Sequence, residues 1–222
     1  ASEAQTWHPD VGFYRIETTA GALVGQFYLD MYAREAKQPG AWMDDCVGHK
    51  TTASGAVTPV AYLVCNFLPP GDGQPALLTH DDVVTLFHEF GHGLHHMLTR
   101  VAYPSLAGIN GVAWDAVELP SQFLENYAWH ERVLAEVSGH VATGERLPDE
   151  TRRQLIATRS FHAGLATMRQ IEFALFDFRL HAEYAPARGG RVLDTLAEVR
   201  REVGVVPAPA WNRFPHSFGH VF

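Results

Sequence analysis

The chain has 222 residues, of which 46% are apolar and 19% are charged, a composition that excludes a disordered, collagenous or coiled-coil protein. Asp and Glu number 25 against 17 Lys and Arg, and this net charge of −8 argues against binding to a nucleic-acid backbone. No apolar run approaches the ~18 residues of a membrane span, and two cysteines, Cys46 and Cys65, are typical of a reducing compartment. The sequence therefore predicts a soluble, cytoplasmic protein with no nucleic-acid or membrane partner.

The first part of the chain, residues 1–79, is predicted to be mainly strands and loops. Runs of β-forming residues are bounded by Gly and Pro turn signals. Strands are expected at residues 11–16, 22–32 and 60–67, with loops around residues 38–40 and 52–59. These strands predict a small N-terminal sheet, in which the last strand could offer a free edge to an extended peptide.

The remainder, residues 80–222, is predicted to be mainly helical. Thr79 is a suitable N-cap, and apolar residues then recur at spacings of three and four to about residue 99. Further helices are expected at residues 114–137, 148–184 and 191–202. The predicted fold class is α+β and predominantly helical, a small N-terminal sheet followed by a helical bundle, organised as one unit over residues 1–222.

The first of these helices contains His88-Glu89-Phe90-Gly91-His92, an HExxH motif of the zincin type. Histidines four residues apart lie on one helix face, so both imidazoles can reach one metal ion at ~2.0 Å. Glu89 is turned away by ~100° and can hold a water molecule on that ion. The plainer alternative is a pair of surface histidines, but a capped amphipathic helix favours the metal site.

Two further histidines follow on the same helix. At ~1.5 Å rise per residue, His96 lies ~12 Å from His88 along the helix axis, too far to share one ion. A site formed by His92 and His96 would lack a neighbouring base. We therefore assign His95 and His96 to packing or to supporting the metal ligands.

A catalytic zinc site normally has a third protein ligand. The metzincin pattern would place Gly and His where this sequence has His95 and Leu98, so the third ligand must come from elsewhere. On the next helix Asp115, Glu118 and Glu125 are available carboxylates. Spacing alone leaves the choice among these three open.

Several segments spread over nearly the whole chain resemble the thimet oligopeptidase family of zinc peptidases, and within it the bacterial oligopeptidases most. These segments are residues 40–46, 76–83, 88–96, 114–126, 176–181 and 213–220. The resemblance implies a zinc metalloendopeptidase that hydrolyses peptide bonds in short oligopeptides. The nearest alternatives are the family's dipeptidyl carboxypeptidase branch and an inactive zinc-binding fragment.

The resemblance also implies roles for the residues of the motif. The glutamate of the family's Val-Glu-Leu-Pro-Ser-Gln-like segment, which ligates zinc, falls on Glu118. His88, His92 and Glu118 would then hold one zinc ion per chain, and Glu89 would act as the general base.

Three further residues receive roles from the resemblance. His220 matches a histidine that contacts the substrate near the scissile carbonyl, and Asp115 and Glu125 are candidates for hydrogen bonding to the zinc histidines. Members of the family are longer, with a helical region before this segment and tyrosines after it that stabilise the oxyanion. The chain is therefore expected to be a catalytic region without those two parts.

Overall fold

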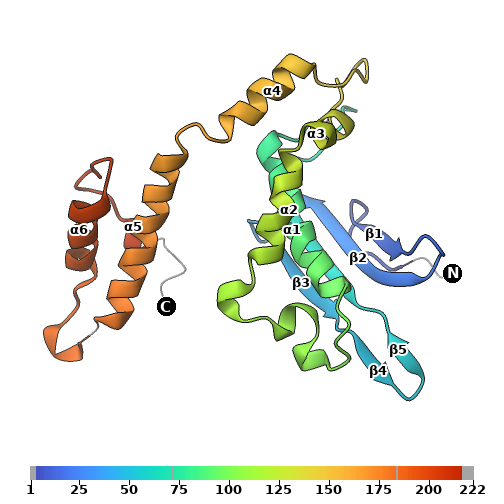
Figure 1. The fold of residues 1–222 in the computed structure, drawn as a ribbon, viewed down its shortest axis with the longest axis horizontal. Coiled ribbons are helices and arrows are strands. Elements are labelled where there is room, and N and C mark those ends of the chain that lie inside the picture. Colours follow the sequence, from blue (N-terminus) through green and yellow to red (C-terminus); the bar gives the residue numbers. More distant parts are fainter. Residues whose placement is uncertain (1–3, 72, 184, 217–222) are drawn as a thin grey trace. The chain divides into compact units, whose positions relative to one another are not determined.

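The computed structural model describes residues 4–71, 73–183 and 185–216, and the chain divides into two compact units, Ala1–Ile156 and Ala157–Phe222 (Figure 1). A small sheet precedes a series of helices, which confirms the predicted α+β, mainly helical fold class. That the two units work as one catalytic unit over residues 1–222 stays a prediction.

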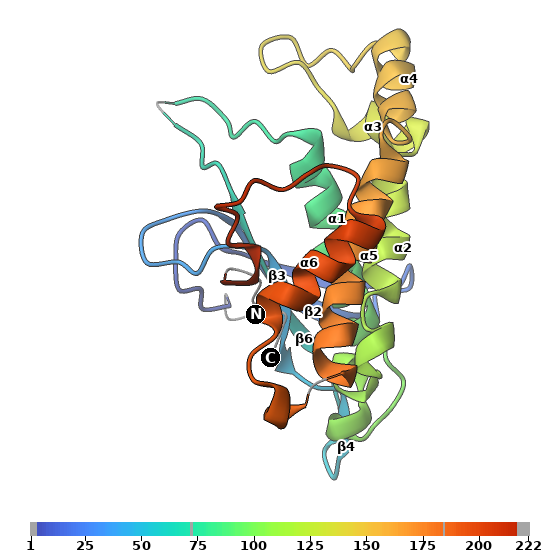
Figure 2. The same cartoon turned by 90° about the vertical axis from the view of Figure 1, so that its left-hand side faces the viewer.

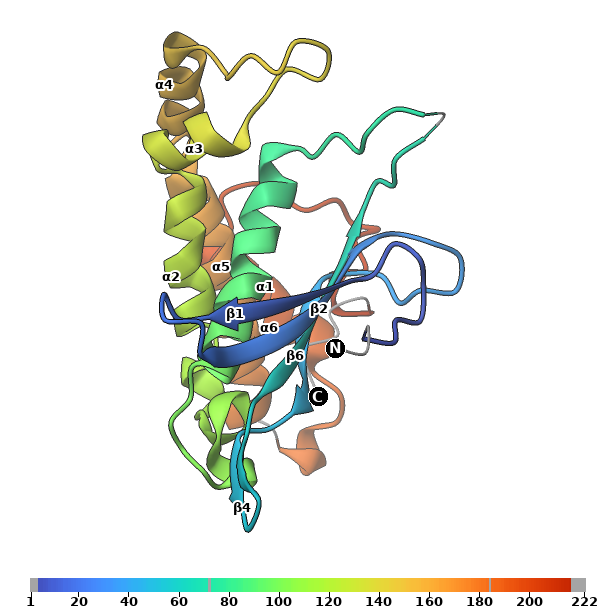
Figure 3. The same ribbon diagram turned by 90° about the vertical axis from the view of Figure 1, so that its right-hand side faces the viewer.

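The first unit is built on a four-stranded sheet with the order β1-β2-β6-β3 (Figure 3). Strand β6 pairs in parallel with β2 and antiparallel with β3, while β1 pairs antiparallel with β2. The strands are β1 (Gly12–Glu17), β2 (Leu23–Tyr32), β3 (Trp42–Val47) and β6 (Val60–Phe67). The three predicted strands are confirmed, but the free edge predicted for residues 60–67 is wrong because β6 has a partner on each side.

Strand β3, the partner that closes this edge, has no counterpart in the sequence prediction. It contains Asp44 and Asp45, and aspartate is depleted in strands, so the segment lacks a β signal. Both side chains are exposed, which is why the sheet tolerates them. A separate hairpin pairs β4 (Lys50–Thr52) with β5 (Gly55–Val57), and β5 lies within the loop predicted at residues 52–59.

The hydrophobic core of the first unit lies around β6, where five of the eight residues are buried. The buried residues of β6 are Ala61, Leu63, Val64, Cys65 and Phe67. Helix α1 (His80–Met97) packs across one face, where the rings of Phe90 and Phe27 meet edge to face at 5.6 Å.

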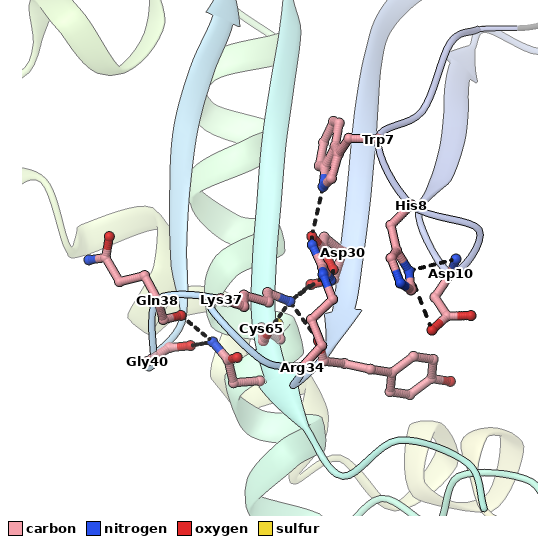
Figure 4. A network of polar contacts seen from close by, with 11 residues as sticks. Trp7, His8, Asp10, Asp30, Arg34, Lys37, Gln38, Gly40 and Cys65 are labelled. Atoms are coloured by element: carbon pink, nitrogen blue, oxygen red, sulfur yellow. Dashed lines mark hydrogen bonds and ion pairs between the residues drawn. The ribbon is translucent and has the colours of Figure 1, made fainter.

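A cluster of polar side chains lies around the buried carboxylate of Asp30 (Figure 4). Arg34 donates to both carboxylate oxygens at 2.6 Å, Lys37 Nζ donates to Oδ1 at 2.8 Å, and the Trp7 indole donates to Oδ2 at 3.0 Å. Lys37 also donates to the backbone carbonyl of Cys65. The ammonium group therefore ties the end of β2 to β6, and the buried charges are paired.

The helix predicted at residues 114–137 is divided in the structure. A 3-10 turn (Trp114–Ala116) precedes α2 (Leu119–Ala128), and α3 (Glu131–Val137) follows a break at Trp129 and His130. Helix α2 lies along α1 (Figures 1 and 3), and the ring of His80, at the start of α1, hydrogen-bonds the carbonyl of Ala128 at 3.0 Å. The two helices are therefore antiparallel.

The segment between α1 and α2 is packed against the rest of the unit. Gly108 is buried with φ +57°, and a Cβ there would lie 2.9 Å from Cα of His96, so both backbone shape and space require glycine. Asn110 donates to Asp45 at 2.9 Å, and the fully buried His96 ring donates to the carbonyl of Val47 at 3.1 Å. The packing role predicted for His96 is confirmed.

The second unit contains α5 (Ala163–Ala182) and α6 (Val192–Val203), which lie side by side (Figures 1 and 2). Glu172 of α5 is buried and accepts from Arg200 of α6 at 2.8 Å, and Phe176 is fully buried. None of the described helices has the length and apolar character needed to cross a membrane.

The helix predicted at residues 148–184 is also divided. Helix α4 (Asp149–Thr158) ends before α5 begins, and between them His162 adopts the left-handed conformation with φ 55°. A left-handed residue stops the helical hydrogen-bond pattern. The helix predicted at residues 191–202 is confirmed as α6.

Candidate functional site

Helix α1 presents the HExxH motif in a regular helix with a well-formed start. Thr79 and Asp82 make a reciprocal capping box, and acidic side chains lie in the first turn. Their negative charge interacts favourably with the positive end of the helix dipole. His88 and His92 project from one face, with ring centroids 5.0 Å apart. The predicted helix, its cap and the shared face of the two histidines are thus present.

Glu118 brings a carboxylate to the two histidines. Its Oε2 atom lies 3.2 Å from Nε2 of His88 and 3.1 Å from Nε2 of His92. Within the described part of the chain, these residues form a group of potential metal ligands with one ligand atom of each within 4.8 Å of the others. Among the three acids that spacing left open, Glu118 is the one that faces both imidazoles through Nε2.

Helix packing explains how Glu118 reaches the motif. At Gly91 the two helices approach so closely that a Cβ would lie 2.6 Å from Cα of Ser121 and 2.7 Å from the carbonyl oxygen of Pro120. Glycine is therefore required at this variable position of the motif. Because α2 begins directly after Glu118, this contact sets the position of the carboxylate relative to the histidines.

The other ring nitrogen of His88 has its own carboxylate partner. Nδ1 of His88 lies 2.7 Å from Oε1 of Glu125, seven residues after Glu118 on the same helix. Nδ1 of His92 is buried and, among the described residues, has no hydrogen-bond partner. The structure thus brings Glu125 to one histidine of the pair.

The remaining predicted site residues lie elsewhere or cannot be placed. Asp115 is exposed in the 3-10 turn before α2, and within the described ranges no hydrogen bond or ion pair joins it to the histidines. His220 lies outside the described residues. His95 is partly buried and lines an apolar cavity of about 720 Å³ between α1, α2 and the segment that joins them.

The electrostatics of the site differ from those of an ordinary surface helix. Glu89 is 5% exposed, and burial raises the pKa of its carboxyl to about 7, with His88 opposing the shift and Glu118 adding to it. Burial also lowers the pKa of His92, which favours the neutral imidazole needed for metal binding, although Glu118 opposes this shift. The arrangement brings together two imidazoles, a carboxylate that faces both of them and the buried carboxyl of Glu89.

Ser121 is a residue of this site that sequence reasoning missed. Its hydroxyl, on a fully buried side chain, donates to Glu118 with an oxygen–oxygen distance of 2.8 Å to Oε2. The spacing of three between Glu118 and Ser121 was a usable signal, because residues three apart on a helix are neighbours.

Comparisons with known proteins show the family to which the chain is related. The chain matches the profile of Peptidase family M3 over residues 1–222. It is 57% identical to oligopeptidase A of Escherichia coli (strain K12) over 99% of this chain and 32% of that protein. It is 54% identical to oligopeptidase A of Haemophilus influenzae over 98% of this chain and 32% of that protein. Dipeptidyl carboxypeptidase of Salmonella typhimurium is 41% identical over 79% of this chain and 25% of that protein. The chain spans about a third of the length of the oligopeptidases that it matches.

Proposed function

Because this chain belongs to peptidase family M3, we propose that it forms the zinc-binding catalytic region of a peptidase that hydrolyses internal bonds of short oligopeptides. The observation that carries this proposal is the convergence of His88, His92 and Glu118, with one ligand atom of each within 4.8 Å of the others. The similarity to proteins named oligopeptidase A supports the substrate class.

The donor set fits a catalytic rather than a structural zinc ion. Two imidazoles and one carboxylate are a ligand set of catalytic zinc, which leaves a fourth position for water or substrate. Structural zinc sites normally have four protein ligands, often thiolates. Cys46 and Cys65 are both free thiols and neither belongs to the cluster. A single zinc ion per chain, held by His88, His92 and Glu118, is therefore the proposed cofactor.

Separate residues of the chain would transfer the proton, bind the substrate and orient the metal ligands. Bound zinc would supply Lewis acidity and lower the pKa of a coordinated water to about 7. Glu89 would accept a proton from the attacking water and then deliver it to the leaving amine. His220 would hydrogen-bond the substrate near the scissile carbonyl, and Glu125 would orient His88 through Nδ1. Asp115, which forms no hydrogen bond or ion pair with either histidine among the described residues, is left without this role.

Metal analysis combined with peptide hydrolysis tests the proposal. We expect the whole protein to contain one zinc ion per chain and to cleave short peptides, and we expect His92→Ala to lose both properties. Zinc retained at full stoichiometry in His88→Ala and His92→Ala would place the metal elsewhere. Repeating the assay on residues 1–222 alone would decide whether this region is active or only binds zinc.

A second candidate function is that of a dipeptidyl carboxypeptidase. It is supported by the 41% identity to proteins of that name. A peptide with an amidated C-terminus separates the two activities, because an endopeptidase needs no free C-terminal carboxylate. Internal cleavage of the amidated peptide supports the endopeptidase. Release of C-terminal dipeptides from the free peptide, without cleavage of the amidated one, supports the carboxypeptidase.

We also propose a cytoplasmic location. Cys46 is partly buried, Cys65 is fully buried, and both are free thiols. Unpaired thiols are typical of reducing compartments. Fractionation of cells that produce the protein, with a cytoplasmic marker enzyme as the reference, tests this location.

A further inference from the structure

The hydroxyl of Ser121 occupies a place in the site that the metal ligands and the base do not explain. Its Oγ atom lies 2.8 Å from Oε2 of Glu118 and 2.9 Å from the backbone oxygen of the same residue. We infer that Ser121 is a positioning residue, which holds the Glu118 carboxylate in the orientation that meets His88 and His92. This inference rests on the proposed zinc site.

The carboxylate, rather than the backbone carbonyl, is the acceptor that needs this hydroxyl. The carbonyl oxygen of Glu118 already accepts the helical hydrogen bond from the backbone N–H of Gln122 at 3.0 Å. A hydroxyl has a single proton, and a hydrogen bond to an ionised oxygen is stronger than one to a neutral carbonyl. The Ser121 hydroxyl therefore donates its proton preferentially to Oε2 of Glu118, the same oxygen that faces both histidines.

Other restraints on the Glu118 side chain are few. It is 52% exposed, and although Glu118 is the N-cap of α2, its carboxylate does not cap the helix by accepting from the first turn's backbone. A glutamate side chain has considerable rotamer freedom to lose when it is fixed as a ligand. A buried hydroxyl bonded to the ligand oxygen reduces that freedom before the metal binds, which is the general effect of groups that orient metal ligands.

Ser121 lies where α1 and α2 come into closest contact. Cα of Ser121 faces Gly91 at the closest approach of α1 and α2, where a Cβ on residue 91 would lie 2.6 Å away. A large residue at position 121 would compete for the space through which α1 and α2 make contact. Ser121 is fully buried at this contact, so its hydroxyl is a donor shielded from solvent.

Metal affinity measured by competition with a chromogenic chelator tests this inference on the whole protein. We expect Ser121→Ala to weaken zinc binding by about 10- to 100-fold, the usual effect of removing a group that orients a ligand. In a Glu118→Ala background, the same substitution should have no further effect, because the residue acts through Glu118. Cobalt(II) binding gives a second readout, and we expect its visible absorption to change in Ser121→Ala.

The matched control is Ser138→Ala, which removes a hydroxyl whose oxygen accepts from the backbone N–H of Leu147 in the α3–α4 connection. We expect it to leave zinc affinity unchanged, and thermal unfolding of the metal-free proteins checks that every variant folds. Wild-type affinity in Ser121→Ala, or an equal loss with and without Glu118, would overturn the inference while the zinc site stands. Failure of the wild-type protein to bind zinc would overturn the proposed function and this inference together.

Discussion

Two regions of the first unit each bury a carboxyl group, and the pKa of that group is shifted in opposite directions in the two regions. In the Asp30 cluster, burial alone would raise the pKa of the carboxyl, but hydrogen bonds from Arg34, Lys37 and Trp7 outweigh it and hold the pKa well below its usual range. At the HExxH motif, burial raises the pKa of Glu89 to about 7, and His88 opposes this rise only in part. The two carboxyls are similarly buried, at 2% and 5% exposure.

The difference separates a structural cluster from a candidate reactive one. Every strong donor around Asp30 is supplied by the chain itself, so the cluster needs nothing from outside to be stable. Glu89, by contrast, lies beside two imidazoles and a second carboxylate, a group that a bound cation would complete. Substitutions in the first region should therefore change stability, and substitutions in the second should change metal binding and turnover.

The largest expected effect is that of Glu89→Gln on catalysis. The amide cannot accept the proton of the attacking water, so peptide hydrolysis by the whole protein should fall by about 10²–10⁴-fold in kcat/KM. Zinc content should be unchanged, because Glu89 is not a proposed ligand. Turnover close to wild type would remove Glu89 from the role of general base.

Removing one cation from the Asp30 cluster should cost stability and leave zinc affinity intact. Lys37→Met leaves a buried carboxylate short of a partner, and we expect the free energy of unfolding to fall by about 3 kcal/mol. Urea denaturation measures this change, with Lys50→Met as the control because Lys50 is exposed in β4. Adding Asp30→Asn to Lys37→Met should recover part of the loss, and no recovery would mean that Lys37 acts by packing.

The same cluster predicts an acid-sensitive contribution to stability. The pKa of Asp30 is lower in the folded than in the unfolded protein, so this contribution is complete above the unfolded pKa of about 4 and is lost as the pH falls below it. We expect about 2 kcal/mol of unfolding free energy to depend on Asp30 in this way. Urea denaturation from pH 6 to pH 3 should therefore show a shallower fall in Asp30→Asn than in wild type. If the unfolding free energy of wild type and of Asp30→Asn fell in parallel with pH, Asp30 would not be the source of the acid-sensitive contribution.

The smallest expected effect concerns the hydrogen bond between Glu125 and His88. Glu125→Ala removes the acceptor 2.7 Å from Nδ1, and zinc affinity should fall by about tenfold. The exposed Glu136→Gln is the control, since Glu136 forms an ion pair with Arg132 on α3. The matched variant Asp115→Asn decides whether the second predicted acid also supports the histidines. Equal affinities of Glu125→Ala and wild type would show that the hydrogen bond does not tune the metal site.

Local patterns were sufficient to predict the parts of the site that lie on one helix. The Thr79 cap and the spacing of His88 and His92 involve residues within a few turns of each other, and the structure has them as predicted. The same holds for α6, where apolar periodicity marks the helix nearly to its ends. Local patterns did not predict the helix breaks at His130 and His162. Residues 129–130 and 159–162 contain neither proline nor glycine, and the nearby Gly164 lies inside α5.

The sequence by itself determined that a capped helix carries two histidines on one face with Glu89 next to them in the chain, because helix period and capping depend on neighbours along the chain. Spacing along the chain left open which acids of the next helix meet the histidines, and the tertiary structure shows the contacts. Glu118 faces Nε2 of both histidines, and Glu125 reaches Nδ1 of His88. That division depends on how closely α1 and α2 approach at Gly91, and contacts between helices are set by packing rather than by spacing within either helix.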